Sequence, residues 1–465
     1  MLNSGHGSPY LQGNFAPIRT EDDFELTASG DVPVELCGAL YRVGPNPQFE
    51  PRDPNYHWFT GDGMMHGFYF ENGKVQYRNR YVRTPRWKLE HEAGRSLFGS
   101  FGNPMTTDPI ARGKDSGGAN THILYQAGKL LALSEAHMPM EVDPVTLETK
   151  GYVESYRSRV TAHPKIDPVT GEMIWFAYDS GPGPFTNELS FGITAADGSV
   201  TRRDGIIAPF SSMIHDFMVT QDYAMIPVLP LTGSFDRAMG GQSAYAWEPD
   251  LGGHIAVMRR DGSGDIRWFN VDSCYVFHVL NAWQEGGKLF ADVLRYDQPP
   301  LFPRVDGKTG ERHAGELMRW TFDLDAPSNA VKEETLDDLF GEFPRIDHRF
   351  ETRKNVHGWY LGDPAGYGAG GQTAVVHKNL QTGKREKFEL GADSPASEPV
   401  FVPRSQEAGE GDGYLMTVVY RTPENRSDLL IFEATDLEKG PIATVHVPRR
   451  IPYGFHGSWV AGDMG

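Results

Sequence analysis

The sequence predicts an all-β protein, most simply a closed propeller, and three observations carry this prediction. Gly and Pro are abundant, at 53 and 33 of 465 residues, which favours many tight turns over long helices. Short apolar runs rich in β-branched and aromatic residues alternate with turns of Gly, Asp, Asn and Pro, which is typical of consecutive hairpins. The chain is also too long for one ordinary core, yet no low-complexity linker divides it. We therefore expect residues 1–465 to form a single repetitive β-propeller domain.

Hairpins can be assigned to particular segments. The clearest pairs residues 255–260 with 266–271 across a turn at 261–265, whose glycines permit positive φ. Similar turns are predicted at residues 71–74 and 196–199. Each of these segments reads as two short strands joined by a tight loop, the unit from which a propeller blade is built.

Two further local features complete the survey of elements. The tetrapeptide Asp-Pro-Val-Thr occurs twice, beginning at Asp143 and Asp167, and we interpret both copies as ordinary turn starts. Helical signal is confined to short patches such as residues 333–339, EETLDDL. Helices are therefore expected to be few and short.

Composition limits the class of partner and the compartment. The chain carries 44 basic and 62 acidic residues, a net charge of −18, which argues against nucleic acid or an anionic membrane as the main partner. Cys37 and Cys274 are the only cysteines, too few for a disulfide framework or a thiolate metal site. The N-terminus lacks a signal-peptide pattern, and neither a spanning segment nor a basic amphipathic anchor helix is evident. We expect a soluble cytoplasmic protein.

Four of the 16 histidines stand out because most of their immediate neighbours are apolar or aromatic. They are His163, His215, His278 and His456. A buried imidazole needs partners for both nitrogens, and metal ligation through one with an acceptor on the other satisfies both at once. The alternative is four separate core histidines, each with its own hydrogen-bond partners.

The spacing of these histidines favours a shared site. The intervals are 52, 63 and 178 residues, so with blades of roughly 60 residues the four fall at similar points on blades n, n+1, n+2 and n+5. Equivalent inner strands of a propeller converge on its axis. This spread excludes a local zinc site, whose ligands lie only a few residues apart.

At these residues the chain resembles the carotenoid cleavage oxygenases, a family that also contains stilbene-, lignostilbene- and isoeugenol-cleaving enzymes. The resemblance rests on segments 38–47, 59–64, 119–121, 398–404, 410–414 and 456–459 together with the four histidine contexts. It implies a seven-bladed β-propeller with a capping dome of loops and short helices. It also implies an axial Fe(II) held by the four histidines.

The resemblance also implies roles for four further residues. Glu135, Glu342 and Glu398 match carboxylates that orient three of the iron-bound imidazoles; such an acceptor sets the tautomer and raises ligand basicity. Judged by residue type alone, each would be a solvated surface group. Thr121 matches a residue whose methyl group partly blocks one coordination site, although it is equally readable as an ordinary strand threonine.

The implied reaction is cleavage of one conjugated C=C bond by O2 to give two carbonyl products. The partners are then O2 and a small hydrophobic alkene, with no nicotinamide, flavin or 2-oxo acid. Two other classes stay open. A propeller glycoside hydrolase needs axial carboxylates and leaves the four histidines without a role, and a non-catalytic binding propeller needs no metal.

Substrate choice rests on three positions. Phe59 matches a substrate contact of the stilbene and isoeugenol branch, but the lignostilbene enzymes grip a phenol oxygen with Tyr and Lys where this chain has Phe101 and Ser134. A phenol would lack its partners there, so we expect an apolar wall. The tail at residues 451–456 resembles apocarotenoid-cleaving members. The expectation is an apocarotenoid substrate, with an aryl olefin as the alternative.

Overall fold

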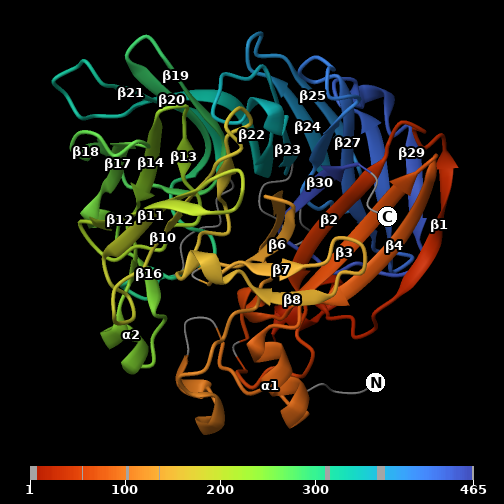
Figure 1. The fold of residues 1–465 in the computed structure, drawn as a ribbon, viewed down its shortest axis with the longest axis horizontal. Helices are drawn as coiled ribbons and strands as arrows, with labels where there is room; N and C mark the ends of the chain where they lie inside the picture. Colours follow the sequence, from red (N-terminus) through yellow and green to blue (C-terminus); the bar gives the residue numbers. More distant parts are fainter. Residues whose placement is uncertain are drawn as a thin grey trace.

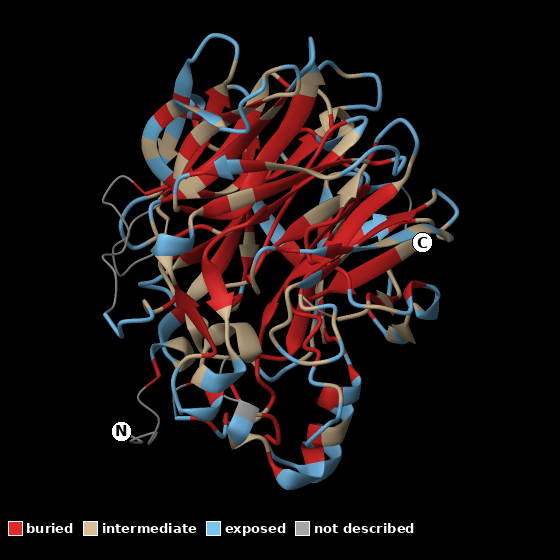
Figure 2. Ribbon diagram, turned by 90° about the vertical axis from the view of Figure 1, so that its left-hand side faces the viewer, coloured by how far each residue is buried: buried red, intermediate tan, exposed pale blue. Residues whose placement is uncertain are grey.

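The computed structural model describes residues 8–54, 56–100, 104–135, 137–308, 315–363 and 372–462. Within these residues the strands form a seven-bladed β-propeller, as the sequence predicts. The chain runs around the ring from red to blue, and its first and last blades lie side by side (Figure 1). Buried residues fill the strands, while exposed residues gather in the loops that join them (Figure 2).

Each blade is an antiparallel sheet. Blade 1 contains β2 (Gly38–Pro45), β3 (Gly63–Glu71), β4 (Lys74–Tyr81) and β30 (Gly457–Ala461); blade 2 contains β5 (His122–Gln126), β6 (Lys129–Leu133), β7 (Met140–Val142) and β8 (Thr149–Tyr152). Blade 3 contains β9 (Lys165–Ile166), β10 (Met173–Ala177), β11 (Glu188–Thr194) and β12 (Val200–Ile207). Blade 4 contains β13 (Met218–Val219), β14 (Tyr223–Val228), β17 (Gly253–Arg259) and β18 (Arg267–Val271).

The remaining blades share a long strand. Blade 5 contains β19 (Tyr275–Glu285), β20 (Lys288–Tyr296), β21 (Gly315–Asp323) and the first half of β22 (Lys332–Arg345). Blade 6 contains the second half of β22 with β23 (His357–Gly362), β24 (Ala374–Asn379) and β25 (Arg385–Glu389). Blade 7 contains β26 (Val400–Pro403), β27 (Gly413–Arg421), β28 (Arg426–Glu433) and β29 (Ala443–Val447).

Two strands close the ring. The C-terminal β30 pairs with β2 as the inner strand of blade 1. The N-terminal β1 (Asp23–Gly30) pairs with β4 along its first half and with β29 along its second half, which joins blades 1 and 7. This pairing fastens the two ends of the ring, and the blades of a propeller keep only short, protected sheet edges.

Helices and minor strands lie outside the blades. They are α1 (Pro85–Ala93), α2 (Phe235–Met239), the two-stranded sheet β15 (Leu231–Gly233) and β16 (Tyr245–Trp247), and the 3₁₀ turns η1 (Pro9–Leu11), η2 (Gly13–Phe15), η3 (Trp58–Thr60), η4 (Pro104–Thr106), η5 (Pro109–Ala111), η6 (Glu154–Tyr156), η7 (Pro249–Leu251), η8 (His348–Phe350) and η9 (Leu437–Lys439). None of the helices described is long and apolar enough to cross a membrane.

Aromatic side chains fill the space between blades. The ring centroids of Phe176 and Phe217 lie 4.9 Å apart between blades 3 and 4, and those of Phe269 and Phe322 lie 5.4 Å apart between blades 4 and 5. Some strands are covered on both faces, as is β2, where every residue is buried. The blades are thereby held at fixed angles around the axis.

The predicted hairpins are confirmed, whereas one predicted helix is wrong. Turns at 71–74, 196–199 and 261–265 join β3 to β4, β11 to β12 and β17 to β18. Residues 333–339, expected to be helical, lie in β22, where Glu333 pairs with Trp320 of β21. Pairing with a buried neighbouring strand overrides the weak helical preference of EETLDDL.

Helix α1 was not anticipated, although its boundaries carry local signals. The Thr84 side chain accepts a hydrogen bond from the backbone N–H of Trp87, Pro85 occupies the first turn, and Gly94 ends the helix at φ 66°. This arrangement of cap, proline and left-handed glycine is typical of a helix. Only one face of the helix is buried, so its apolar pattern is too weak to stand out.

Candidate metal centre

The four singled-out histidines meet at the inner ends of the blades. His163 and His456 precede the inner strands β9 and β30, His215 lies three residues before β13, and His278 lies within β19. These strands belong to blades 3, 1, 4 and 5, which is the arrangement predicted from the spacing. All four side chains are buried, and each offers one nitrogen within 4.8 Å of the others.

The nitrogen separations fit a single metal ion. The Nε2 atoms lie 3.0 Å apart for His163 and His215, 3.2 Å for His215 and His278, and 3.1 Å for His278 and His456. A histidine nitrogen binds a transition metal at about 2.0–2.1 Å, so two ligands at right angles stand about 3 Å apart. The four residues therefore fit one ion at their centre.

Burial favours the neutral form that a metal needs at two of the four imidazoles, whereas at His278 burial is outweighed by the charge and hydrogen bond of Glu342, which raise the pKa. The pKa values of His163 and His456 lie well below the ordinary value, first because of burial and then because neighbouring imidazoles disfavour a second charge. A neutral imidazole has a free lone pair for coordination. The cluster is therefore ready to bind a cation.

Three of the imidazoles are backed by the three predicted carboxylates. Nδ1 of His215 donates to Oε1 of Glu135, and Nδ1 of His278 donates to Oε2 of Glu342. Nδ1 of His456 donates to Oε1 of Glu398 over 2.8 Å. With Nδ1 protonated and held in this way, each Nε2 lone pair is directed at the common centre.

The carboxylates are held in turn by groups that sequence reasoning missed. The Tyr178 hydroxyl donates to Glu135 over 2.6 Å, and the Tyr296 hydroxyl donates to Glu342 over 2.7 Å. Glu398 instead accepts the backbone N–H of Gly457 over 2.8 Å. Each tyrosine lies more than 40 residues from its carboxylate, so no local motif could have indicated the pairing.

Phe343 is a further site residue that the sequence did not reveal. Its φ of 57° is in the left-handed region, which costs a non-glycine residue about 1–3 kcal/mol. Its ring stacks on that of His278 at 5.3 Å between centroids and 28° between planes. The strained backbone lets adjacent residues reach the same imidazole by different routes, Glu342 by hydrogen bonding and Phe343 by stacking.

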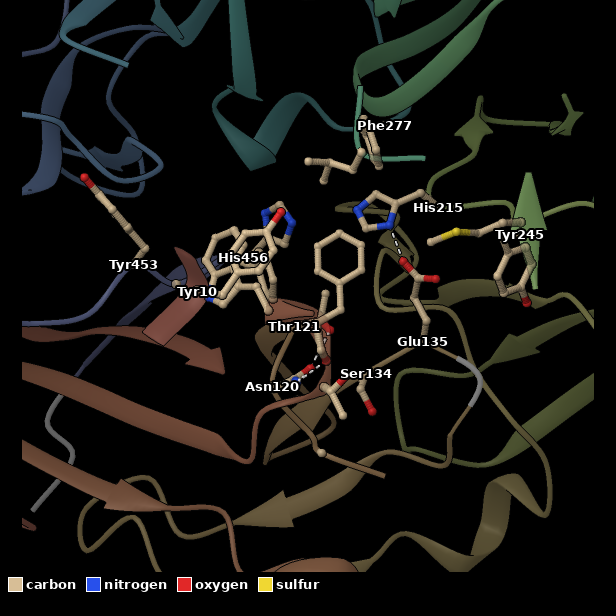
Figure 3. A pocket seen from close by; sticks show the side chains of 18 of the residues that line it. Tyr10, Asn120, Thr121, Ser134, Glu135, His215, Tyr245, Phe277, Tyr453 and His456 are labelled. Atoms are coloured by element: carbon tan, nitrogen blue, oxygen red, sulfur yellow. Dashed lines mark hydrogen bonds and ion pairs between the residues drawn. The ribbon is translucent and has the colours of Figure 1, made fainter. Parts of the chain in front are cut away.

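A cavity of about 780 Å³ opens beside the cluster and is lined by His215, His278 and His456. Many of its other lining residues are aromatic, including Trp58, Phe59, Phe185, Phe277, Phe343 and Phe455. Figure 3 shows His215, with Glu135 behind it, and His456 facing this space together with Thr121 and Phe277. The size and lining are those of a pocket for an apolar small molecule.

The other predicted site residues lie at this cavity. Thr121 lines it, and its hydroxyl donates to Oδ1 of Asn120 over 3.0 Å, while Asn120 is itself fixed by a 2.7 Å bond to the carbonyl of Gly61. Phe59 and Ser134 line the same space. Phe101 falls outside the described residues.

The wall near Ser134 is more polar than expected. Arg86 and His137 line the same cavity as Ser134, and His137 Nδ1 lies 3.5 Å from the Ser134 hydroxyl. The loss of a Tyr and Lys pair at positions 101 and 134 therefore does not leave an apolar wall, because cationic and imidazole groups reach the cavity from other segments.

A β-propeller with four converging imidazoles at its axis, three of them backed by carboxylates, defines a metalloprotein with a mononuclear site beside a cavity with many aromatic walls. Residues 15–461 match the family model described as retinal pigment epithelial membrane protein, and the chain belongs to this family.

Relatives agree on the family and differ in the alkene after which they are named. Isoeugenol monooxygenase of Pseudomonas nitroreducens is 39% identical over 479 residues, covering 99% of both chains. Carotenoid cleavage oxygenase 1 of Neurospora crassa is 34% identical, covering 97% of this chain and 91% of that protein. The crystal structure of Pseudomonas brassicacearum lignostilbene dioxygenase superposes with a TM-score of 0.94 at 36% identity, covering 98% of this chain and 99% of that one. The resemblance to carotenoid cleavage oxygenases is confirmed.

Proposed function

We propose that the protein is a non-haem Fe(II) dioxygenase that cleaves one conjugated C=C bond with O2 to give two carbonyl products. The observation that carries this proposal is the convergence of four buried imidazoles, three of them held by carboxylates, beside a cavity with many aromatic walls. Imidazole ligands suit Fe(II), which is a borderline metal ion. Iron(II), when bound, supplies the one-electron chemistry that O2 needs to react with an alkene.

The residues of the chain have distinct roles in this reaction. His163, His215, His278 and His456 hold the metal, and Glu135, Glu342 and Glu398 fix the tautomer and direction of three of these rings. Thr121, whose hydroxyl is occupied by Asn120, limits access at the metal. The contacts of the histidines and glutamates support their roles, and the role of Thr121 rests on the family resemblance.

The cavity positions the alkene and excludes water. Phe59, with Phe455 5.5 Å away between ring centroids, forms part of an aromatic wall against which a flat conjugated molecule packs. Both atoms of O2 end in the two carbonyl groups, and the alkene provides all four electrons, so no separate reductant is required. The bond that is cleaved is the one that the cavity holds beside the histidines.

Two alkene classes fit this proposal. The sequence favours an apocarotenoid, and the aryl olefin is the alternative; relatives of similar identity are named after each class. A cavity of about 780 Å³ lies within the usual range for drug-sized ligands and does not discriminate between them by size.

The test is a screen of the metal-loaded protein against apocarotenals, stilbenes and propenylphenols with mass spectrometry of the products. We expect about one iron per chain and, for at least one alkene, a pair of aldehydes whose carbon atoms add up to the substrate. Full activity with stoichiometric zinc, or every alkene left intact by iron-loaded protein, would contradict the proposal.

A further inference from the structure

Arg86 is a buried cation on the wall of the cavity. It lies in the first turn of α1, outside the ring of blades (Figure 1), and its residue is 6% exposed. Its side chain lines the cavity that also reaches the histidine cluster. Burying a guanidinium is costly unless charges and hydrogen bonds compensate it, so the partners of Arg86 determine what it can do.

Two carboxylates balance the charge of Arg86 without using its hydrogen-bond donors. Asp62 and Glu90 each place an oxygen 3.6 Å from Nε, which is beyond hydrogen-bond distance. The other oxygen of each carboxylate is engaged by the backbone: Glu90 Oε1 accepts the N–H groups of Leu97 and Phe98, and Asp62 Oδ2 accepts that of Gln48. Across the described residues Arg86 makes no hydrogen bond, and its Nε is buried without a partner. A planar cation with five donors thus remains unsatisfied beside a cavity.

His137 supplies the complementary acceptor on the same cavity. Its Nδ1 donates to the carbonyl oxygen of Glu135 over 2.8 Å, which leaves the Nε2 lone pair unprotonated. Burial lowers the pKa of His137, and the nearby positive charge of Arg86 lowers it further, so the ring is neutral near pH 7. Nε2 lies 3.9 Å from Asp115, too far for a hydrogen bond.

We propose that Arg86 and His137 form a hydroxyl-binding subsite for the substrate of the cleavage reaction. The N–H groups of Arg86 donate to the hydroxyl oxygen, and Nε2 of His137 accepts the hydroxyl proton. The two carboxylates beside Arg86 already balance its charge, so the subsite suits a neutral phenol-type hydroxyl rather than a carboxylate. The inference rests on the proposed function. It assigns to Arg86 and His137 the binding of the phenol oxygen that Tyr and Lys perform in the lignostilbene enzymes, where this chain has Phe101 and Ser134.

Binding of three matched probes tests this subsite without requiring turnover. The probes are 4-hydroxystilbene, which donates and accepts; 4-methoxystilbene, which only accepts; and unsubstituted stilbene, which does neither. Dissociation constants are measured by quenching of tryptophan fluorescence in the metal-loaded protein. A hydrogen bond from a charged donor changes affinity by about 10- to 100-fold, so we expect the hydroxyl probe to bind most tightly, the methoxy probe less tightly and stilbene least.

Two variants separate the donor from the acceptor. Arg86→Met should remove the advantage of the methoxy probe over stilbene and leave the binding of stilbene unchanged, while His137 keeps part of the preference for the hydroxyl probe. His137→Phe should remove the difference between the hydroxyl and methoxy probes and retain the advantage of both over stilbene. Arg83→Met is the matched control, because Arg83 lies on the same segment with its side chain 52% exposed and pairs with Glu21. It should preserve the wild-type order.

The outcomes distinguish this inference from the proposed function. Equal binding of the three probes by the wild-type protein overturns the subsite even if all are cleaved, and this result does not depend on whether Arg86→Met folds. The expected binding order without cleavage of any alkene supports the subsite and contradicts the oxygenase reaction. An advantage of the methoxy probe over stilbene that survives in Arg86→Met, folded with an unchanged melting temperature, also overturns the role of Arg86.

Discussion

Two cavities reach the same histidine cluster, and they differ in size and chemistry. The larger, about 780 Å³, has many aromatic lining residues, whereas a smaller one of about 340 Å³ is lined by ionic groups that include Lys165, Asp216 and Arg345. In the smaller cavity the charges are paired: Lys165 Nζ lies 2.8 Å from Asp216, and Arg345 lies 3.3 Å from Glu398. The contrast indicates that the larger cavity receives the substrate, while the ion pairs of the smaller cavity hold the inner strands in place.

The largest effect is expected where the two cavities meet. His278 lines both cavities and is one of the four converging imidazoles. His278→Ala should abolish metal binding and reduce turnover to background, while the propeller stays folded because its stability is spread over all blades. Metal analysis, turnover and circular dichroism measure these outcomes. His254→Ala, at a partly exposed histidine of blade 4 that bonds only Asn270, is the control, and equal metal content in both variants would contradict the assignment.

The second prediction concerns a variant that breaks the ion pair between Lys165 and Asp216 in the smaller cavity. Lys165→Met leaves the carboxylate of Asp216, whose side chain is 2% exposed, without its cation. Removing one partner of a buried pair typically costs about 3–5 kcal/mol, so the urea midpoint should fall markedly. The relative affinities for the three stilbene probes should not change. A changed probe order with an unchanged midpoint would show that the smaller cavity, not the larger, selects substrate.

The third prediction concerns a carboxylate that lines the larger cavity. Glu342→Gln keeps the shape of the side chain but weakens the orientation and basicity of His278, so metal affinity or activity should fall by roughly 10- to 100-fold. Glu285→Gln, at an exposed residue that pairs with Lys354, is the control. Iron affinity and turnover equal to wild type in Glu342→Gln would indicate that Glu342 has only a structural role.

The smallest effect is expected for the tyrosines that donate to the carboxylates behind the histidines. Tyr296→Phe removes the hydroxyl that donates to Glu342 over 2.7 Å, and leaving a buried acceptor unsatisfied costs about 1–3 kcal/mol. We expect a melting temperature lower by a few degrees and a modest loss of metal affinity. Tyr178→Phe, which removes the equivalent donor to Glu135, should behave alike. A normal metal affinity in both variants would confine the tyrosines to a structural role.

Local signals explain which elements could be predicted. The turn at Asn72 and Gly73 has positive φ at both residues, and glycine with asparagine is the pattern that a tight hairpin requires. The patch at 333–339 misled because its residues have moderate helical preference, although it pairs with β21, the strand that directly precedes it in the chain. A short window of residues shows its own helical preference but not its pairing with a second strand, and here the pairing decides.

The residues of the candidate site also fall into two groups, those that the sequence indicated and those that it did not. The four histidines could be found because their apolar neighbours and regular intervals reflect burial at equivalent points of successive blades. The glutamates were singled out by motif, not by residue type. Tyr178, Tyr296 and Arg86 could not be found, since each acts on a partner or a cavity that only folding brings near.

By itself, the sequence determined an all-β chain of hairpins with histidines at blade-spaced intervals, because turn chemistry and apolar patterning are properties of neighbouring residues. Only the tertiary structure decided how the ring closes through β1 and β30, which donor holds each carboxylate, and that Arg86 reaches the substrate cavity. These features depend on contacts between residues tens to hundreds of positions apart. Such contacts follow from how the blades pack and not from any local preference.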